Sequence, residues 1–259
     1  MSTNVRLNST DPVIEFRDVE YESGGRKILS ALSLAIHRGE ILVLLGRSGS
    51  GKTTALKLVN RLLTLSRGEI HVDGRNVKDW DVIKLRRHIG YAIQDVGLFP
   101  HYTVERNIGL ILSLERWEKE KIHTRVQELL RLVGLNPDLA SRYPNQLSGG
   151  QRQRVGVARA LAADPPILLM DEPFGALDPL TRADLQREFS SLQRKLQKTV
   201  LFVTHDLHEA LRLGSRIALL EAGKLVSVGS PDEFLSSSDA LIMKYVEAFG
   251  SIEEARGRK

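Results

Sequence analysis

The chain has 259 residues, of which 42% are hydrophobic and 27% charged, as is ordinary for a globular protein with a large core. It contains no cysteine, which excludes disulfide bonds and thiolate metal sites. Its net charge of +5 would suit nucleic acid, anionic lipid or a nucleotide. We expect a soluble, cytoplasmic protein, because Met1–Leu7 lacks a signal-peptide core and no apolar run approaches the roughly 18 residues of a membrane span.

Alternating apolar and polar residues predict the first strands. The alternation runs over Val13–Tyr21 and again over Leu32–Ile36, and a further strand is expected over Gly68–Gly74. These segments predict a small antiparallel sheet beside the core. Tyr21 could stack on an adenine ring or pack in the core, and the sequence leaves both interpretations open.

A complete phosphate-loop motif, G-x-x-x-x-G-K-[ST], occupies Gly46–Thr53. It follows the apolar run Ile41–Leu45, which predicts a buried strand, and leads into a predicted helix over Thr54–Val59. The glycines let backbone N–H groups close around phosphates, and the helix N-terminus adds partial positive charge. Lys52 would reach the terminal phosphates, and the Thr53 hydroxyl would ligate Mg²⁺. The motif predicts nucleoside triphosphate binding.

The next part of the chain combines a strand with a helical insert. The apolar run Ile89–Gln94 predicts a strand that ends in a polar glutamine. From Val104 to Ala163 the apolar residues follow a helical period, which predicts a helical subdomain at about 96–163. One helix face is predicted from the spacing of Ile122, Val126, Leu129, Leu130 and Val133.

Within this insert lies Leu147–Gln151, followed by a predicted helix over Arg152–Ala162. Ser148 is a favourable N-cap, and Gly149 and Gly150 leave backbone N–H groups accessible at the positive end of the helix. This segment is a second candidate anion site, without a lysine of its own. An ordinary capped helix would fit the same five residues.

Titratable residues stand at the ends of two further predicted strands. The apolar run Ile167–Met170 leads into Asp171 and Glu172, which places a carboxylate at the ligand-binding edge of an α/β sheet. Asp171 is suited to bind Mg²⁺ through a water molecule, and Glu172 could polarise an attacking water. His205 ends the strand Thr199–His205; such a histidine is usually structural, but the same sheet carries the phosphate loop, which favours function.

The remaining segments continue the alternation of helices and strands. A helix is expected over Leu180–Leu196, and a strand over Ile217–Glu221 should pair with Lys224–Val228 across a glycine turn. We expect Ala255–Lys259 to be disordered.

The phosphate loop, Gln94, Leu147–Gln151, Asp171–Glu172 and His205 occur in this order. Together they closely resemble the nucleotide-binding subunit of ABC transporters over roughly residues 13–235, because Leu-Ser-Gly-Gly-Gln before an apolar strand and Asp-Glu is the signature of that family. The resemblance implies an α/β fold with a P-loop NTPase core of ABC type, an antiparallel β-subdomain and a helical subdomain. It implies one ATPase domain over residues 1–245 and a tail over 246–259.

The resemblance assigns many of these residues to ATP. Tyr21 matches the aromatic residue that stacks on adenine, and Asp178 matches the acid of the D-loop that crosses between subunits. The signature residues, which bind the γ-phosphate held by the other subunit, are matched by Ser148, Gly149, Gly150 and Gln151. The Walker A loop is matched by Gly46, Arg47, Ser48, Gly49, Ser50, Gly51, Lys52, Thr53 and Thr54.

It assigns other residues to catalysis and metal binding. Glu172 matches the catalytic glutamate, and His205 matches the switch histidine. Lys52 is assigned to catalysis together with them. Gln94 matches the Q-loop residue that touches Mg²⁺ and senses the membrane partner, and Asp171 matches the Walker B acid. The implied Mg²⁺ ligands are therefore Thr53, Gln94 and Asp171. Because no motif is degenerate, we expect an active ATPase that uses ATP and Mg²⁺.

A narrower resemblance rests on Asn60-Arg61 and the segment Leu85–Val104. It points to the ATPase of bacterial quaternary-amine importers, which carry glycine betaine, choline and related osmoprotectants. Many of these carry C-terminal regulatory domains, and this sequence is too short to hold one. The implied partners are a second copy in an ATP-dependent, head-to-tail homodimer, integral membrane permease subunits, and a periplasmic or lipid-anchored solute-binding protein. We expect no nucleic acid partner and a peripheral location on the cytoplasmic face of the membrane.

Two other functions fit parts of this pattern. A soluble ABC ATPase that remodels nucleic acid or ribosomes would suit the basic charge, but such relatives usually carry two cassettes or a long coiled-coil insert. An exporter cassette would share the ATPase motifs. A neighbouring gene for a multi-span permease would argue against the first alternative, and a gene for a solute-binding protein would argue against the second.

Overall fold

The computed structural model describes residues 11–94, 96–175 and 177–248, and the chain divides into two compact units. Unit 1 comprises Met1–Leu85 and Thr199–Lys259, and unit 2 comprises Arg86–Lys198. The boundary falls within helix α2 (Val82–His88). The prediction for Ala255–Lys259 lies outside the described residues.

Unit 1 contains the predicted antiparallel sheet, with strand order β2-β1-β4-β5. The strands of this sheet are β1 (Pro12–Ser23), β2 (Arg26–His37), β4 (Arg67–Val72) and β5 (Arg75–Asn76). The strands are longer than the alternating pattern predicted, because β1 and β2 remain paired up to Ser23 and Arg26. The tight turn between them is possible because Gly24 and Gly25 adopt positive φ.

Four further strands of unit 1 lie side by side in the order β10-β9-β3-β8. The five residues of β3 (Ile41–Leu45) are all buried, and β3 runs parallel to β8 (Thr199–Thr204) and β9 (Arg216–Glu221). The strand β10 (Lys224–Gly229) is antiparallel to β9, as predicted. A central strand with parallel neighbours on both sides carries a continuous apolar sequence because both of its faces are covered.

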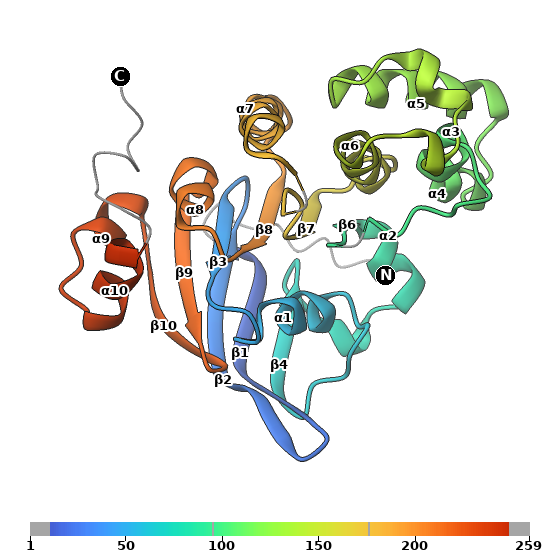
Figure 1. Ribbon diagram of the computed structural model, residues 1–259. Coiled ribbons are helices and arrows are strands. Elements are labelled where there is room, and N and C mark those ends of the chain that lie inside the picture. The colour runs from blue at the N-terminus through green and yellow to red at the C-terminus, as the bar shows by residue number, and fades with distance from the viewer. Residues whose placement is uncertain (1–10, 95, 176, 249–259) are drawn as a thin grey trace. The chain divides into compact units, whose positions relative to one another are not determined.

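The helices of unit 1 include three that the sequence analysis did not predict. They are α8 (Leu207–Leu213), α9 (Pro231–Leu235) and α10 (Ala240–Ala248), beside α1 (Lys52–Val59) and the 3₁₀ turn η1 (Val77–Asp79). Figure 1 shows α9 and α10, in red, packed together beside β10. Helix α10 includes the first three residues of the predicted tail over 246–259.

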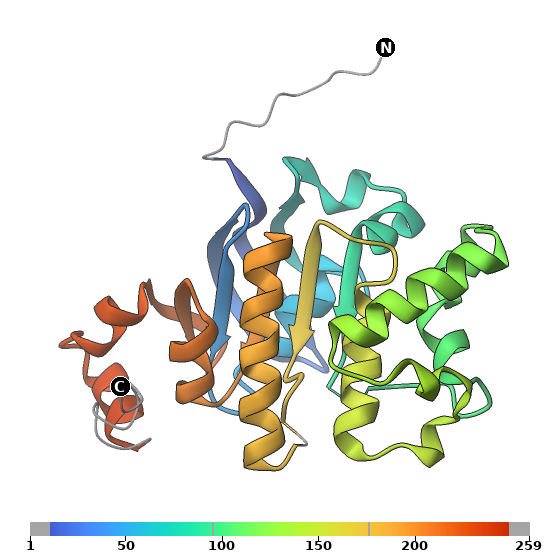
Figure 2. The ribbon, with the colours of Figure 1, turned by 90° about the horizontal axis from the view of Figure 1, so that it is seen from above.

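Unit 2 pairs β6 (Ile89–Ala92) with β7 (Ile167–Asp171) in parallel and is otherwise helical. Figures 1 and 2 show α3 to α6 clustered together in the green to yellow part of the ribbon. Among the described residues, no helix is both long and apolar enough to cross a membrane. The helices are α3 (Val104–Ile108), α4 (Leu110–Leu114), α5 (Lys119–Leu132), α6 (Gly149–Ala160) and α7 (Pro179–Leu196), with 3₁₀ turns η2 (Pro137–Ser141) and η3 (Pro144–Gln146).

Several predicted ends of helices and strands were wrong by two or three residues, and N-caps explain two of these differences. Helix α1 begins at Lys52 because Gly51, with φ near 102°, forms its N-cap. Helix α6 begins at Gly149 because Ser148 caps it, and it ends at Ala160. The strand β6 ends at Ala92, so Gln94 lies just beyond the strand.

Candidate functional site

The phosphate loop connects β3 with α1, and its lysine is enclosed by the backbone of the loop. Lys52 is only 5% exposed, and its Nζ donates hydrogen bonds to the carbonyl oxygens of Gly46 at 2.7 Å and Arg47 at 2.8 Å. The backbone N–H of Ser50 donates to the same Arg47 carbonyl at 3.2 Å. A buried ammonium group at the N-terminus of a helix is a strong site for an anion.

The groups around this lysine fit a polyphosphate. The Ser50 hydroxyl oxygen is buried and has no hydrogen-bond partner among the described residues, so it offers a donor for a ligand. Gly49 adopts φ near 80°, and a Cβ built there would meet nothing within 4 Å. Gly51 is backed by Leu29, because a Cβ at Gly51 would lie 2.7 Å from the Leu29 side chain. The space beside Gly49 is therefore free, whereas the space beside Gly51 is filled by the Leu29 side chain.

Two other predicted residues lie in unit 1. Leu45 is paired with Thr204, so Gly46 and His205 follow neighbouring strands at the same edge of the sheet. His205 is exposed, and Asp206 beside it caps α8. Tyr21 lies on β1 opposite Leu29, the residue that backs Gly51. The structure thus brings His205 to the edge that carries the loop and places Tyr21 opposite Leu29.

The predicted carboxylates lie together in unit 2. Ala92 is paired with Met170, so Gln94 and Glu172 follow β6 and β7 side by side, and Gln94 Nε2 donates to Glu172 Oε2 at 3.4 Å. Asp171 is buried and accepts a hydrogen bond from the Tyr91 hydroxyl at 3.5 Å. Burial and the charge of Asp171 hold the pKa of Tyr91 well above its usual value, so Tyr91 remains a donor.

Glu172 has a backbone conformation that is unusual for a residue with a side chain. Its φ is near 44°, in the left-handed region, which costs about 1–3 kcal/mol at a constrained site. Its carbonyl accepts from the Gly175 backbone N–H at 3.1 Å. Such strain is found at functional sites, and Glu172 contacts Gln94 whereas the preceding Asp171 contacts Tyr91.

The segment Leu147–Gln151 forms a capped helix start in unit 2. Ser148 Oγ accepts from the backbone N–H of Gln151 at 3.2 Å, and Gln151 Oε1 accepts from the Ser148 N–H at 2.9 Å. Gly150 packs close to α7, because a Cβ there would lie 3.1 Å from Thr181. Asp178 caps α7 by accepting from the Thr181 N–H at 3.0 Å, and hydrogen bonds from the Thr181 side chain and backbone lower the pKa of the Asp178 carboxyl.

The order and chemistry of these residues correspond to one protein family. Residues 29–175 match the family model described as ABC transporter, and this span contains the phosphate loop, Gln94, Leu147–Gln151 and both carboxylates. The chain belongs to the ABC transporter family.

Curated members of the family are similar over most of this chain. The glycine betaine/carnitine/choline transport ATP-binding protein OpuCA of Bacillus subtilis is 54% identical over 212 residues, which are 82% of this chain and 56% of that protein. The glycine betaine uptake system ATP-binding protein YehX of Escherichia coli is 50% identical over 219 residues, which are 85% of this chain and 71% of that protein. The chain spans little more than half the length of OpuCA.

Solved ABC cassettes share the fold. The dimeric ATP-binding cassette MJ0796, in a post-hydrolysis state bound to ADP and Pi, gives a TM-score of 0.77 at 35% identity and covers 84% of this chain and 98% of its own. The protein cbiO1 of Clostridium perfringens, part of the transporter complex cbiONQ, gives a TM-score of 0.79 at 26% identity. The match covers 92% of this chain and 95% of the cbiO1 chain. These similarities confirm the predicted P-loop NTPase fold of ABC type.

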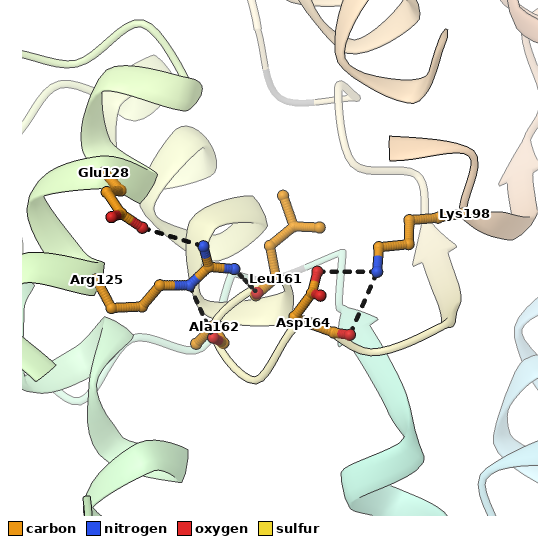
Figure 3. A network of polar contacts seen from close by, with 6 residues as sticks. All are labelled: Arg125, Glu128, Leu161, Ala162, Asp164 and Lys198. Carbon is orange, nitrogen blue, oxygen red and sulfur yellow. Dashed lines mark hydrogen bonds and ion pairs between the residues drawn. The ribbon is translucent and has the colours of Figure 1, made fainter. Parts of the chain in front are cut away.

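The signature helix α6 of this ABC chain is also held at its C-terminal end, by the contacts in Figure 3. Arg125 donates to the carbonyl oxygens of Ala162 at 3.2 Å and Leu161 at 3.3 Å, and Lys198 pairs with Asp164 at 2.8 Å. A guanidinium group there satisfies open carbonyl groups and opposes the negative end of the helix dipole. The signature segment is therefore presented by a helix with both ends capped.

The residues that hold the segment after Gln94 were missed by the sequence analysis. Asn107 is fully buried; its Oδ1 accepts from the Phe99 N–H, and its amide donates to the carbonyl groups of Phe99, Tyr102 and Thr103 at 3.0–3.1 Å. Arg159 of α6 donates to the carbonyl groups of Val96 and Gly97. The N-cap Thr103, four residues before Asn107, was the only sequence signal for this arrangement.

Proposed function

We propose that this chain is the ATP-binding and ATP-hydrolysing subunit of an ABC importer, with one ATPase domain over residues 1–245 and a helical part at about 96–163. The observation that carries the proposal is the buried Lys52 ammonium, enclosed by the Walker A backbone beside the unpartnered Ser50 hydroxyl. These groups suit the β- and γ-phosphates of ATP. The names of OpuCA and YehX, both ATP-binding proteins, support the same conclusion.

The proposed catalytic roles follow from the chemistry of each side chain. Glu172 orients the attacking water, with the Gln94 amide as its neighbour at 3.4 Å, and His205 acts from the edge that follows β8. The proposed Mg²⁺ ligands Thr53, Gln94 and Asp171 offer oxygen donors, which this cation prefers. When bound, Mg²⁺ would neutralise charge on the phosphates. Tyr21 would stack on the adenine ring.

We propose that the active protein is a head-to-tail homodimer that closes on ATP. Ser148 and Gly149 are exposed and lack a lysine, so the signature segment suits a phosphate held by a second copy of the chain. Asp178, which lies beside it at the start of α7, would contribute to the same interface. The dimeric cassette structure of MJ0796 supports this arrangement.

The proposed partners are permease subunits and a periplasmic or lipid-anchored solute-binding protein, with this chain on the cytoplasmic face of the membrane. The proposed solutes are quaternary amines such as glycine betaine and choline, which the names of the curated relatives mention. A docking surface for the permease is offered by Phe99, which is 41% exposed beside His101 and Tyr102. The relatives are transport proteins, and this disfavours a role on nucleic acid or ribosomes.

Solute-dependent ATPase activity tests this function. The chain is co-purified with the membrane proteins encoded beside it, reconstituted with the solute-binding protein, and assayed with glycine betaine, choline, an amino acid and a sugar. We expect stimulation by the quaternary amines, and none in a complex that carries Lys52→Ala. Stimulation by the amino acid or the sugar alone would contradict the proposed solute class. No hydrolysis under any condition would contradict the ATPase assignment.

A further inference from the structure

Tyr91 on β6 contacts the predicted Walker B acid at the end of the neighbouring strand. Its hydroxyl donates to Asp171 Oδ2 at 3.5 Å. A tyrosine hydroxyl is protonated at neutral pH and an ionised carboxylate only accepts, so the direction of this hydrogen bond is fixed. The contact joins a residue that the sequence analysis did not single out to one of the proposed Mg²⁺ ligands.

The register of the two strands explains how Tyr91 reaches this carboxylate. Tyr91 is paired with Leu169 in the parallel ladder of β6 and β7. Asp171 lies two residues beyond Leu169 and therefore on the same face of β7, because side chains alternate between the two faces of a strand. The Tyr91 ring thus extends diagonally toward the carboxyl end of β7, where its hydroxyl meets Asp171.

The backbone that carries Tyr91 is held by two elements of unit 2. The ladder with β7 fixes it on one side. The preceding residue, Gly90, packs against the end of α6, because a Cβ built there would lie 2.2 Å from the Ala160 carbonyl oxygen and 2.9 Å from the Pro165 side chain. Only glycine permits such a close approach. The position of the Tyr91 hydroxyl is therefore set by the packing of β6 against β7 and α6.

Asp171 is a residue whose orientation should affect metal binding. Its side chain is buried, and a buried carboxylate is stable only when its oxygens have polar or charged partners. A carboxylate at the end of a parallel strand fits Mg²⁺, which takes oxygen ligands in a nearly ideal octahedral arrangement. Hydrogen bonds to a metal-ligating carboxylate orient it, and their loss typically weakens metal binding by about 10- to 100-fold.

The neighbouring contact between the same two chain segments differs in kind. Gln94 Nε2 donates to Glu172 Oε2 at 3.4 Å, but both residues are themselves proposed to act on metal or water. Tyr91 has no such proposed role, and its printed contact is with Asp171. Any effect of its hydroxyl on the site would therefore pass through the Asp171 carboxylate.

We propose that Tyr91 is a positioning residue for Asp171: its hydroxyl orients the carboxylate and thereby raises the affinity of the nucleotide site for Mg²⁺. The inference rests on the proposed function, since Asp171 is a metal ligand only in that function. Loss of the hydroxyl should weaken metal binding. It should leave the binding of nucleotide without metal unchanged, because Lys52 and its loop hold the phosphates.

The test compares Tyr91→Phe with the wild-type chain and uses Mn²⁺ as a spectroscopic probe for the metal site. The chain is saturated with ADP, Mn²⁺ is titrated in, and electron paramagnetic resonance measures the free ion. We expect the Kd for Mn²⁺ to rise about 3- to 10-fold, because the one hydrogen bond that is lost is long. The Kd for a fluorescent ATP analogue in EDTA and thermal unfolding without ligands should change little, since the phenyl ring keeps the packing of β6.

Steady-state hydrolysis provides a second readout of the same effect. The Mg²⁺ concentration at half-maximal ATPase activity should rise by the same factor as the Kd for Mn²⁺, and excess Mg²⁺ should restore kcat, because Glu172 is not altered. The matched control is Tyr245→Phe on α10, in unit 1, which removes a buried tyrosine hydroxyl that donates to Glu221 Oε2 at 3.4 Å. The control should alter neither the Kd for Mn²⁺ nor the Mg²⁺ requirement.

An unchanged Kd for Mn²⁺ in Tyr91→Phe would overturn the positioning role. Equal losses in Mn²⁺ binding and in metal-free nucleotide binding would also overturn it, as would a fall in kcat that excess Mg²⁺ does not restore. Either result would indicate a general disturbance of the protein. Failure of the wild-type chain to bind the ATP analogue or to hydrolyse ATP would instead contradict the proposed function.

Discussion

The Walker A loop and the signature segment, defined by residues 46–53 and 147–151, are both proposed anion sites at helix N-termini, but they differ in what would complete them. The Walker A loop encloses its own cation, since Lys52 and Ser50 are buried by the backbone around them. The signature segment leaves Ser148 and Gly149 exposed and uses the Ser148 side chain to cap its own helix. As proposed sites, the first has its cation within one chain, whereas the second would be completed by an anion held outside the chain.

The two sites are also supported differently. The Walker A loop is fixed mainly by backbone hydrogen bonds, such as that from Gly223 to Ser50. In unit 2, side chains supply the support: Arg125 holds the end of helix α6, and Arg159 and the buried Asn107 hold the segment over 96–103. Substitutions at the first site should therefore change ATP binding, whereas substitutions at the second site should change dimer assembly and turnover.

The largest effect is expected from Lys52→Ala. Removing the only lysine of the two sites should lower hydrolysis by about 10²–10³-fold or more, and should weaken ATP binding about 10- to 100-fold, because a charge-assisted contact is lost. Hydrolysis and binding of a fluorescent ATP analogue measure the two effects. Wild-type turnover in this variant would show that the loop is not the primary phosphate site.

Ser148→Arg should stop turnover and leave binding at the Walker A loop within about twofold of wild type, because it adds a bulky cation to the exposed site only. Losing the N-cap also costs about 1 kcal/mol of stability. Ser230→Arg is a matched control, since Ser230 forms the same capping box on α9 with Glu233. Equal loss of turnover in both variants would indicate that capping, and not the composite site, is responsible.

Glu172→Gln should lower the hydrolysis rate about 10²–10⁴-fold, because the carboxylate that acts on water is removed while the ATP contacts remain. Closed dimers should then accumulate with MgATP, and light scattering measures their mass. Adding Ser148→Arg should return the chain to a monomer. A monomer under every condition, with wild-type activity proportional to protein concentration down to nanomolar levels, would exclude a composite site.

Asn107→Ala should act on stability rather than on ATP binding. It removes all four hydrogen bonds of a buried side chain, including those to the Phe99 N–H and the Tyr102 carbonyl, which should lower the free energy of unfolding by about 2–4 kcal/mol. Thermal and urea unfolding measure this loss. The control Asn136→Ala removes one exposed hydrogen bond, from the Asp138 N–H, and should cost about 1 kcal/mol or less. Similar losses in the two variants would refute the supporting role of Asn107.

The sequence alone determined the features that depend on neighbouring residues. The phosphate loop, the Ser148 cap and the apolar strands around β3 could be predicted because glycine geometry, capping and strand period act over a few residues. Functional roles for the carboxylates and His205 could be suggested from their places at the ends of apolar strands, and the family resemblance made these roles specific. Their exact partners could not.

Tertiary structure decided which distant residues meet. Tyr91 reaches Asp171 across 80 residues because β6 and β7 pair in a particular register, and that register depends on packing throughout unit 2. Helix α10 was missed as an element, so the sequence carried no sign that its Tyr245 hydroxyl donates to Glu221. That contact exists because α10 packs on α9 and α9 packs on β9, which no local pattern in α10 specifies.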